Sequence, residues 1–173
     1  MKDFIALDFE TADNGRDSAC AIGLVRVSRG EIVKRTCFLI KPPRSRIIFS
    51  HIHGIYWRDV AHEPTFAELW PRLMPEFEDV SFIAAHNAPF DRGVLAACCI
   101  AAGVAMPVAP FKCTVQLARK AWNIHPTKLS DVCQRLNIPL NHHHAGSDAE
   151  ACARIVMLAQ QKLILPRDMN IKI

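Results

Sequence analysis

The chain has 173 residues, of which 50% are hydrophobic and 22% are charged, and its formal net charge is +4. This is the composition of an ordinary globular domain, long enough to bury a core. No apolar run approaches the length of a membrane span, so no membrane partner is expected. The mildly positive net charge is compatible with a polyanionic partner but does not require one. We expect one domain over residues 1–173, with its core at about 4–163 and a short C-terminal tail.

The seven cysteines indicate the redox environment of the protein. Their number is odd, they show no C-x-x-C spacing, and most of them lie in apolar runs. We therefore expect reduced core residues rather than a disulfide or zinc framework. The first predicted strand begins almost at the N-terminus, which leaves no room for a signal peptide. Together these features favour a cytoplasmic protein.

The N-terminal half of the chain predicts strands. Its first apolar run, residues 4–11, is typical of a buried central strand. Residues 21–27 and 32–40 predict two further strands, joined by a hairpin turn at 28–31. The proline-containing stretch 41–46 cannot continue a strand, and it predicts a basic surface loop.

The C-terminal half predicts mainly helices. Thr65 and Glu68 have the spacing of a capping box, which opens a helix to about Glu78. Ser147 and Glu150 have the same spacing and open a final helix to about residue 163. The other predicted elements are a strand at 80–85 and helices at 89–102, 114–122 and 129–136. This order indicates an α/β or α+β domain whose central mixed β-sheet is flanked by α-helices.

Two acids, Asp8 and Glu10, end the first strand. Side chains alternate along a strand, so both carboxylates point to one face, with their Cα atoms about 6.6 Å apart, and Phe9 points away. Unpaired carboxylates this close repel and raise each other's pKa. A divalent cation between them, such as Mg²⁺ or Mn²⁺, would remove this cost. The alternative is a strand that simply runs out into solvent.

Further acids and a histidine run stand where helices are predicted to begin. Asp91 and Asp148 both fall in a first helical turn, where the helix dipole favours a carboxylate. Either one alone is more typical of an ordinary first-turn acid. The run 142–144 consists of three histidines just before Asp148. Neighbours in sequence rarely bind one ion, so an imidazole that takes a proton from water is favoured over a zinc cluster.

The order of these motifs resembles the DEDDh group of DnaQ-like 3′–5′ exonucleases, which includes the epsilon subunit of bacterial DNA polymerase III. The D-x-E motif lies at residues 7–11, the H-N-A-x-F-D motif at 86–91 and the H-x-A-x-x-D motif at 143–148. Residues 52–55 resemble the connector between the first two motifs. The resemblance spans nearly the whole chain and implies a single exonuclease domain with a ribonuclease H-like fold.

The resemblance also implies the site residues. Asp8, Glu10, Asp91 and Asp148 would hold two Mg²⁺ or Mn²⁺ ions. His143 would be the general base, because its spacing places Ala145 on the motif alanine, although His142 and His144 remain open alternatives. The substrate-binding candidates are Phe9, Thr11, His53, Ile55, Asn87 and Phe90. Phe9 is expected in the core, so its place in this set comes from the motif alone.

The expected reaction is removal of nucleoside 5′-monophosphates from the 3′ end of a single strand. DNA is the favoured substrate, and an RNA-directed exonuclease of the same family is the alternative. The epsilon subunit carries a further polymerase-binding segment, whereas this chain stops soon after its last predicted helix, so a stand-alone enzyme is favoured over polymerase association.

Two rival functions belong to other classes. One is a catalytically silent nucleic-acid-binding subunit with the same fold. The other is a zinc hydrolase built on the histidine run, which needs a third protein ligand that the sequence does not identify. A nucleotide-binding enzyme is disfavoured, because neither a G-x-G-x-x-G motif nor a Walker loop is present.

Overall fold

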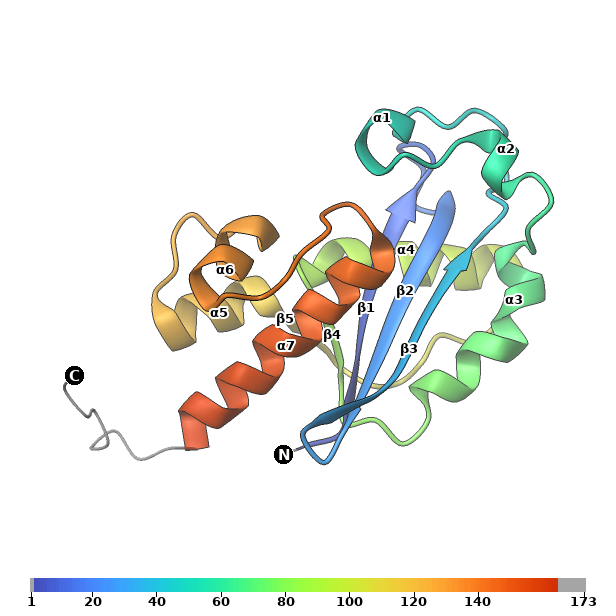
Figure 1. Ribbon diagram of the computed structural model, residues 1–173. Helices are drawn as coiled ribbons and strands as arrows, with labels where there is room; N and C mark the ends of the chain where they lie inside the picture. Colours follow the sequence, from blue (N-terminus) through green and yellow to red (C-terminus); the bar gives the residue numbers. More distant parts are fainter. Residues whose placement is uncertain (1, 165–173) are drawn as a thin grey trace.

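The computed structural model describes residues 2–164, which form a five-stranded sheet with helices on both faces (Figure 1). The strands lie in the order β3-β2-β1-β4-β5. The pairs β1–β2 and β2–β3 are antiparallel, whereas β1–β4 and β4–β5 are parallel. The predicted central mixed sheet flanked by helices is therefore confirmed. Among residues 2–164, no helix is both long and apolar enough to cross a membrane.

The first three strands follow one another directly along the chain. Helices come between β3 and β4, between β4 and β5, and after β5. The strands are β1 (Phe4–Thr11), β2 (Ala19–Ser28), β3 (Glu31–Leu39), β4 (Ile83–Ala85) and β5 (Phe111–Cys113). The helices are α1 (Ser50–His53), α2 (Trp57–Val60), α3 (Phe66–Leu73), the 3₁₀ helix η1 (Met74–Phe77), α4 (Ala88–Ala102), α5 (Thr114–Trp122), α6 (Leu129–Leu136) and α7 (Ala145–Ile164).

Strand β1 lies between two hydrophobic cores, because its side chains point alternately to the two faces of the sheet. Ile5 and Leu7 belong to the core under α3 and α4. Phe4 and Ala6 belong to the core that β1 shares with α5, α6 and α7. Because residues two apart share a face of a strand, the even-numbered series carries Asp8 and Glu10 towards the side that α7 covers. In Figure 1 the α7 ribbon crosses in front of the sheet, with α4 behind it.

A glycine on β2 allows α7 to approach the sheet closely. Gly23 pairs with Asp8 across the β1–β2 ladder, so both residues face α7. A Cβ atom on Gly23 would overlap the carbonyl group of Ala145 and would lie 2.6 Å from the backbone nitrogen of Gly146. The first turn of α7 therefore rests directly on the backbone of β2.

The predicted helix ends need two corrections. The helix opened by Thr65 ends at Leu73 rather than near Glu78, and η1 takes over at Met74. The prediction that Ser147 caps the final helix is wrong, since α7 begins at Ala145. The carbonyl of His144 accepts hydrogen bonds from the Ser147 and Asp148 N–H groups. The Ser147 hydroxyl instead accepts a hydrogen bond, at 2.8 Å, from the N–H of Asn141 in the incoming loop.

Other predicted boundaries differ less. The strand expected at 80–85 is shortened to Ile83–Ala85, and α4 begins at Ala88, one residue before Pro89. The hairpin turn is confirmed: its central residues Arg29 and Gly30 both have positive φ angles, as a tight turn between twisted strands requires. Strand β5 and the short helices α1 and α2 were not predicted, because each spans only three or four residues. The expected C-terminal tail beyond 164 lies outside the described residues.

Candidate active site

Three carboxylates meet where the carboxyl end of β1 lies beside the first turn of α7. One oxygen from each of Asp8, Glu10 and Asp148 lies within 4.8 Å of the others. Asp91 comes from the first turn of α4, and its Oδ1 accepts a hydrogen bond from the Phe9 N–H at 3.1 Å. Both helix N-termini are thus aimed at the end of the strand, where their dipoles favour negative charge.

Glu10, Asp91 and Asp148 are buried and Asp8 is half-buried, and burial raises the pKa values of Asp8, Glu10 and Asp91. Burial, followed by the negative charges of Asp91, Asp148 and Glu10, raises the pKa of Asp8 well above its ordinary value. Burial and then the charge of Asp148 raise the pKa of Glu10 to about 7. Burial also raises the pKa of Asp91 to about 7, against the lowering effect of the Phe9 N–H. Without added positive charge, the protein alone does not hold all these groups ionised at neutral pH.

One oxygen of this cluster fits a metal ligand. Asp148 is 3% exposed, and its Oδ1 is buried with no hydrogen-bond partner among residues 2–164. A buried carboxylate oxygen normally accepts at least one hydrogen bond. Oxygen donors from several carboxylates are the ligands that Mg²⁺ and Mn²⁺ prefer, so the donor set fits divalent cations of this kind.

The three histidines of the run 142–144 do not all point to the same cavity. His142 Nδ1 lies 2.8 Å from Asp148 Oδ2, and the His142 and His143 rings stack with their centroids 3.9 Å apart. The backbone N–H of His143 also donates to Asp148 Oδ2, at 3.2 Å. His144 is turned away: its Nδ1 accepts the Ser147 N–H at 3.3 Å, and the residue lines a different cavity beside Cys37. Of the open alternatives, His142 and His143 therefore lie beside the acids.

The cavity around the acids contains residues that sequence reasoning missed as site residues. Its lining consists of Asp8, Phe9, Glu10, His86, Lys128, Leu129, His142, His143 and Asp148. Lys128 lies just before α6, and its place beside the acids depends on the fold of a loop, so no local motif identifies it. His142 was predicted only as an alternative to His143 for the general base, and its contact with Asp148 was not predicted.

His86 ties the Lys128 loop to the sheet. The Thr127 carbonyl can only accept, so His86 Nε2 donates to it, at 3.0 Å. His86 Nδ1 then accepts from the Thr114 hydroxyl at 2.8 Å in the neutral ring. Burial is the main cause that lowers the pKa of His86. The neutral His86 ring thus links β4, α5 and the loop before α6.

The connector histidine has a similar bracing role. His53 Nε2 donates to the Thr11 carbonyl at 3.2 Å, and its Nδ1 accepts the Ile55 N–H at 3.1 Å. Both ring nitrogens are therefore used within the protein. Thr11 is 8% exposed, and Ile55 is half-buried against the small core around Ala12. These contacts hold the chain after α1 at the end of β1.

The remaining substrate-binding candidates differ in exposure. Phe9 is 4% exposed and lies in the core under α4, whereas its backbone N–H contacts Asp91. Asn87 precedes α4 with a positive φ of 62° and is exposed. Phe90 is 39% exposed in the first turn of α4. Only Asn87 and Phe90 of these three present side chains to solvent.

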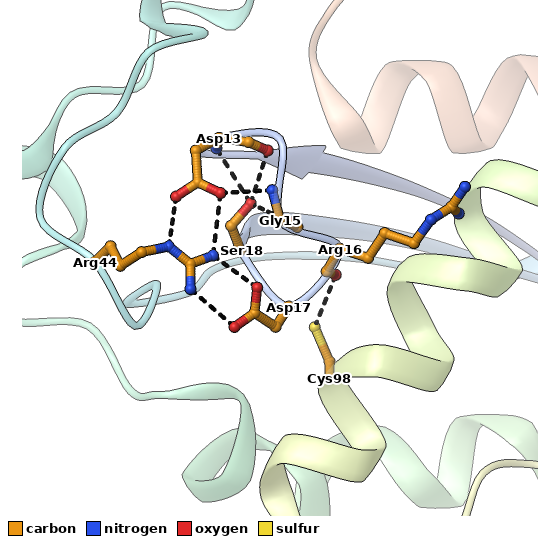
Figure 2. A network of polar contacts seen from close by, with 7 residues as sticks. All are labelled: Asp13, Gly15, Arg16, Asp17, Ser18, Arg44 and Cys98. Atoms are coloured by element: carbon orange, nitrogen blue, oxygen red, sulfur yellow. Dashed lines mark hydrogen bonds and ion pairs between the residues drawn. The ribbon is translucent and has the colours of Figure 1, made fainter.

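The loop that follows β1 is fixed by an arginine from the predicted basic loop. Figure 2 shows the Arg44 guanidinium between the carboxylates of Asp13 and Asp17. It donates to Asp13 at 2.7 and 3.0 Å and to Asp17 at 2.9 and 2.6 Å. These bonds lower the pKa of both carboxyl groups. The segment 41–46 is therefore a surface loop whose Arg44 anchors the β1–β2 loop, a contact that the sequence did not predict.

Comparison with known proteins identifies the family. A family model described as Exonuclease matches residues 5–156. The DNA polymerase III PolC-type of Clostridium perfringens is 32% identical over 167 residues, which cover 93% of this chain and 11% of that protein. The 3′-5′ exonuclease DinG of Bacillus subtilis is 28% identical over 166 residues, which cover 92% of this chain and 18% of that protein. The chain thus spans less than a fifth of these curated relatives.

A solved structure confirms the fold. The structure of Exonuclease X in complex with 5′ overhanging duplex DNA has a TM-score of 0.72 and 23% sequence identity, and the match covers 91% of each chain. At this identity the likeness shows the fold alone, and the predicted ribonuclease H-like fold is confirmed. The sequence matches cover most of the chain, so the resemblance to DnaQ-like exonucleases is also confirmed, and this chain belongs to the exonuclease family.

Proposed function

We propose that this chain is a metal-dependent 3′–5′ exonuclease that releases nucleoside 5′-monophosphates from the 3′ end of a nucleic acid strand. The observation that carries this proposal is the cluster of carboxylates from β1 and α7, with Asp91 of α4 bonded to the same strand. Within residues 2–164 the buried Oδ1 of Asp148 in this cluster has no hydrogen-bond partner. The direction is supported by the name of the DinG relative, a 3′-5′ exonuclease. DNA as the favoured substrate is supported by the PolC-type relative and by the DNA complex of Exonuclease X.

The proposed metal ligands are Asp8, Glu10, Asp91 and Asp148, which would hold two Mg²⁺ or Mn²⁺ ions. Bound in this way, the two ions would lower the pKa of an attacking water and offset charge on the phosphoryl group and the leaving 3′ oxygen. The Phe9 N–H orients Asp91 through its hydrogen bond to Oδ1. The His143 N–H orients Asp148 in the same way through Oδ2.

His143 is the proposed general base, which accepts the proton of the attacking water on a ring nitrogen. Its ring lines the same cavity as Asp8 and Glu10, and it stacks on His142. Stacking restricts the ring orientation, as a base needs if it is to meet a water at one defined position. His144 is the matched comparison, since it is adjacent in sequence and turned away from this cavity.

The terminal nucleotide is proposed to lie between the connector and the first turn of α4. The hydrogen bond between His53 and the Thr11 carbonyl fixes the connector beside β1, and Ile55 belongs to this connector. The exposed Phe90 ring offers a stacking surface for a base, and Asn87 offers an amide for hydrogen bonds. A single-stranded 3′ end has the unstacked base that such contacts need. RNA remains the alternative substrate of the same site.

The proposal is tested with 5′-labelled single-stranded DNA and RNA incubated with Mg²⁺, Mn²⁺ or EDTA and resolved on a gel. We expect a ladder that shortens from the 3′ end, requires the metal and forms faster on DNA. Asp8→Asn should abolish it, whereas the exposed Asp79→Asn should not. Degradation in EDTA, or full activity of Asp8→Asn, would contradict the proposal.

The base is tested with a pair of neighbouring variants. His143→Ala should lower the rate by roughly 10²–10⁴-fold, the usual contribution of a general base, whereas His144→Ala should retain the wild-type rate. An equal loss of rate in the two variants would contradict the assignment of His143 as the general base. Oligonucleotide binding without degradation would instead favour the silent nucleic-acid-binding subunit.

A further inference from the structure

The backbone at His143 brings two neighbouring imidazoles to the same side of the chain. In an extended segment, side chains of consecutive residues point in opposite directions. His143 has a φ angle of 65°, in the left-handed region that few residues other than glycine adopt. The turn places its ring on that of His142, with an interplanar angle of 19°. A backbone outlier beside a site points to a function for the geometry that it enforces.

A third donor lies within reach of both rings. One ring nitrogen each from His142 and His143 and one carboxylate oxygen of Asp148 all lie within 4.8 Å of one another. His142 Nδ1 already contacts Asp148 Oδ2 at 2.8 Å. Both histidines are exposed, so an ion can reach them from solvent. The third ligand that the sequence did not identify for the histidine run is thus supplied by the first turn of α7.

This donor set differs in chemistry from the carboxylate cluster beside it. Two imidazoles and one carboxylate suit Zn²⁺, which prefers nitrogen and sulfur donors in tetrahedral sites and leaves a fourth position for water. The oxygen donors of Asp8, Glu10 and Asp148 suit Mg²⁺ or Mn²⁺. Asp148 belongs to both sets. An ion between the imidazoles and Asp148 therefore competes with the carboxylate cluster for this residue.

We propose that His142, His143 and Asp148 form an inhibitory site for Zn²⁺. Binding requires the two exposed rings to rotate until their nitrogen lone pairs converge on the ion, about 2.0–2.1 Å away. The bound ion then occupies the ring of His143 and one oxygen of Asp148, so neither is available for hydrolysis. Zinc binding stands independently of the exonuclease reaction, whereas inhibition rests on the proposed function.

The first experiment measures zinc binding directly. The wild-type protein is dialysed against Zn²⁺ with Mg²⁺ in large excess, and bound zinc is counted per chain. His142→Asn removes the imidazole but keeps an N–H donor for Asp148, and His144→Ala is the matched control outside the cavity. Loss of even a supporting group costs 10–100-fold in metal affinity, so we expect at least about a tenfold weaker zinc affinity in His142→Asn. His144→Ala should bind zinc like the wild type.

The second experiment measures exonuclease activity at fixed Mg²⁺ with rising Zn²⁺, and each variant is normalised to its own zinc-free rate. We expect inhibition of the wild type and His144→Ala at the same zinc concentration, and of His142→Asn only at a concentration at least about tenfold higher. Absence of zinc from the wild-type protein after dialysis overturns the proposal, as does an equal loss of affinity in the two variants. A protein without nuclease activity would refute the proposed function, but the binding experiment would still decide on the zinc site.

Discussion

The close contact between β2 and α7 makes Gly23→Ala the most informative substitution outside the acids. The new methyl group would overlap the carbonyl of Ala145 and lie 2.6 Å from the Gly146 nitrogen, where ordinary contacts begin at 3.4 Å. Both partners are backbone atoms, so a side-chain rotation cannot relieve the overlap. The first turn of α7 must move away from the sheet by about 1 Å, and Asp148 moves with it.

This displacement should affect activity more than stability. Overpacking of a well-packed interior costs about 1–3 kcal/mol of the free energy of unfolding. A misplacement of about 1 Å in a catalytic arrangement can cost roughly 10²-fold in rate. We therefore expect Gly23→Ala to remain folded in a urea titration while the rate of 3′-end removal falls by about 10²-fold.

Gly146→Ala is the matched control, because it changes a glycine to alanine on the other side of the same contact. The three atoms nearest to a Cβ there belong to the side chains of His144, at 3.3 and 3.5 Å, and of Cys37, at 3.4 Å. We expect near wild-type activity and unchanged or higher stability, since alanine is the better helix former. Wild-type activity in Gly23→Ala, or an equal loss in Gly146→Ala, would refute the reasoning.

Three further predictions concern elements around the site. The pKa of His86 is lower in the folded protein than in the unfolded chain. As the pH falls, His86 is therefore protonated in the unfolded chain before it is protonated in the folded protein, and stability should fall below about pH 6.5. The difference in urea midpoint between pH 7.5 and 5.5 should accordingly shrink in His86→Gln, and an unchanged difference would contradict this assignment. Thr65→Ala removes the capping box of α3 and should cost about 0.5–2 kcal/mol in chemical denaturation, whereas Thr65→Ser should retain most of the stability. Arg44→Gln removes the exposed ion pairs with Asp13 and Asp17, so its melting temperature should fall below that of the wild type at low salt, and added NaCl should narrow the gap.

The sequence predicted features that depend on local periodicity. Alternation along β1 was sufficient to place Asp8 and Glu10 on one face and Phe9 in the core, and the structure agrees. The capping residues at Thr65 were sufficient to place the start of α3. The bounds of α5 and α6 also follow the predicted ranges, because their apolar spacing leaves few alternatives.

Features that depend on contacts between distant segments could not be predicted in this way. The start of α7 was misplaced because Ser147 bonds to Asn141, a competing use of the hydroxyl that the spacing to Glu150 does not reveal. The pairing of Arg44 with the β1–β2 loop joins residues about thirty positions apart. His142 contacts Asp148 next to the left-handed backbone at His143, and the spacing of the three histidines does not reveal which of them adopts that conformation.

The position of α7 in the chain has a consequence for biosynthesis. Helix α7 supplies Asp148 and covers the face of the sheet that carries Asp8 and Glu10. A nascent or truncated chain that ends before Ala145 therefore lacks one carboxylate and leaves that face without its cover. The cluster can assemble only after nearly all of the described chain has left the ribosome, so incomplete translation products would lack the complete carboxylate set of the proposed exonuclease site.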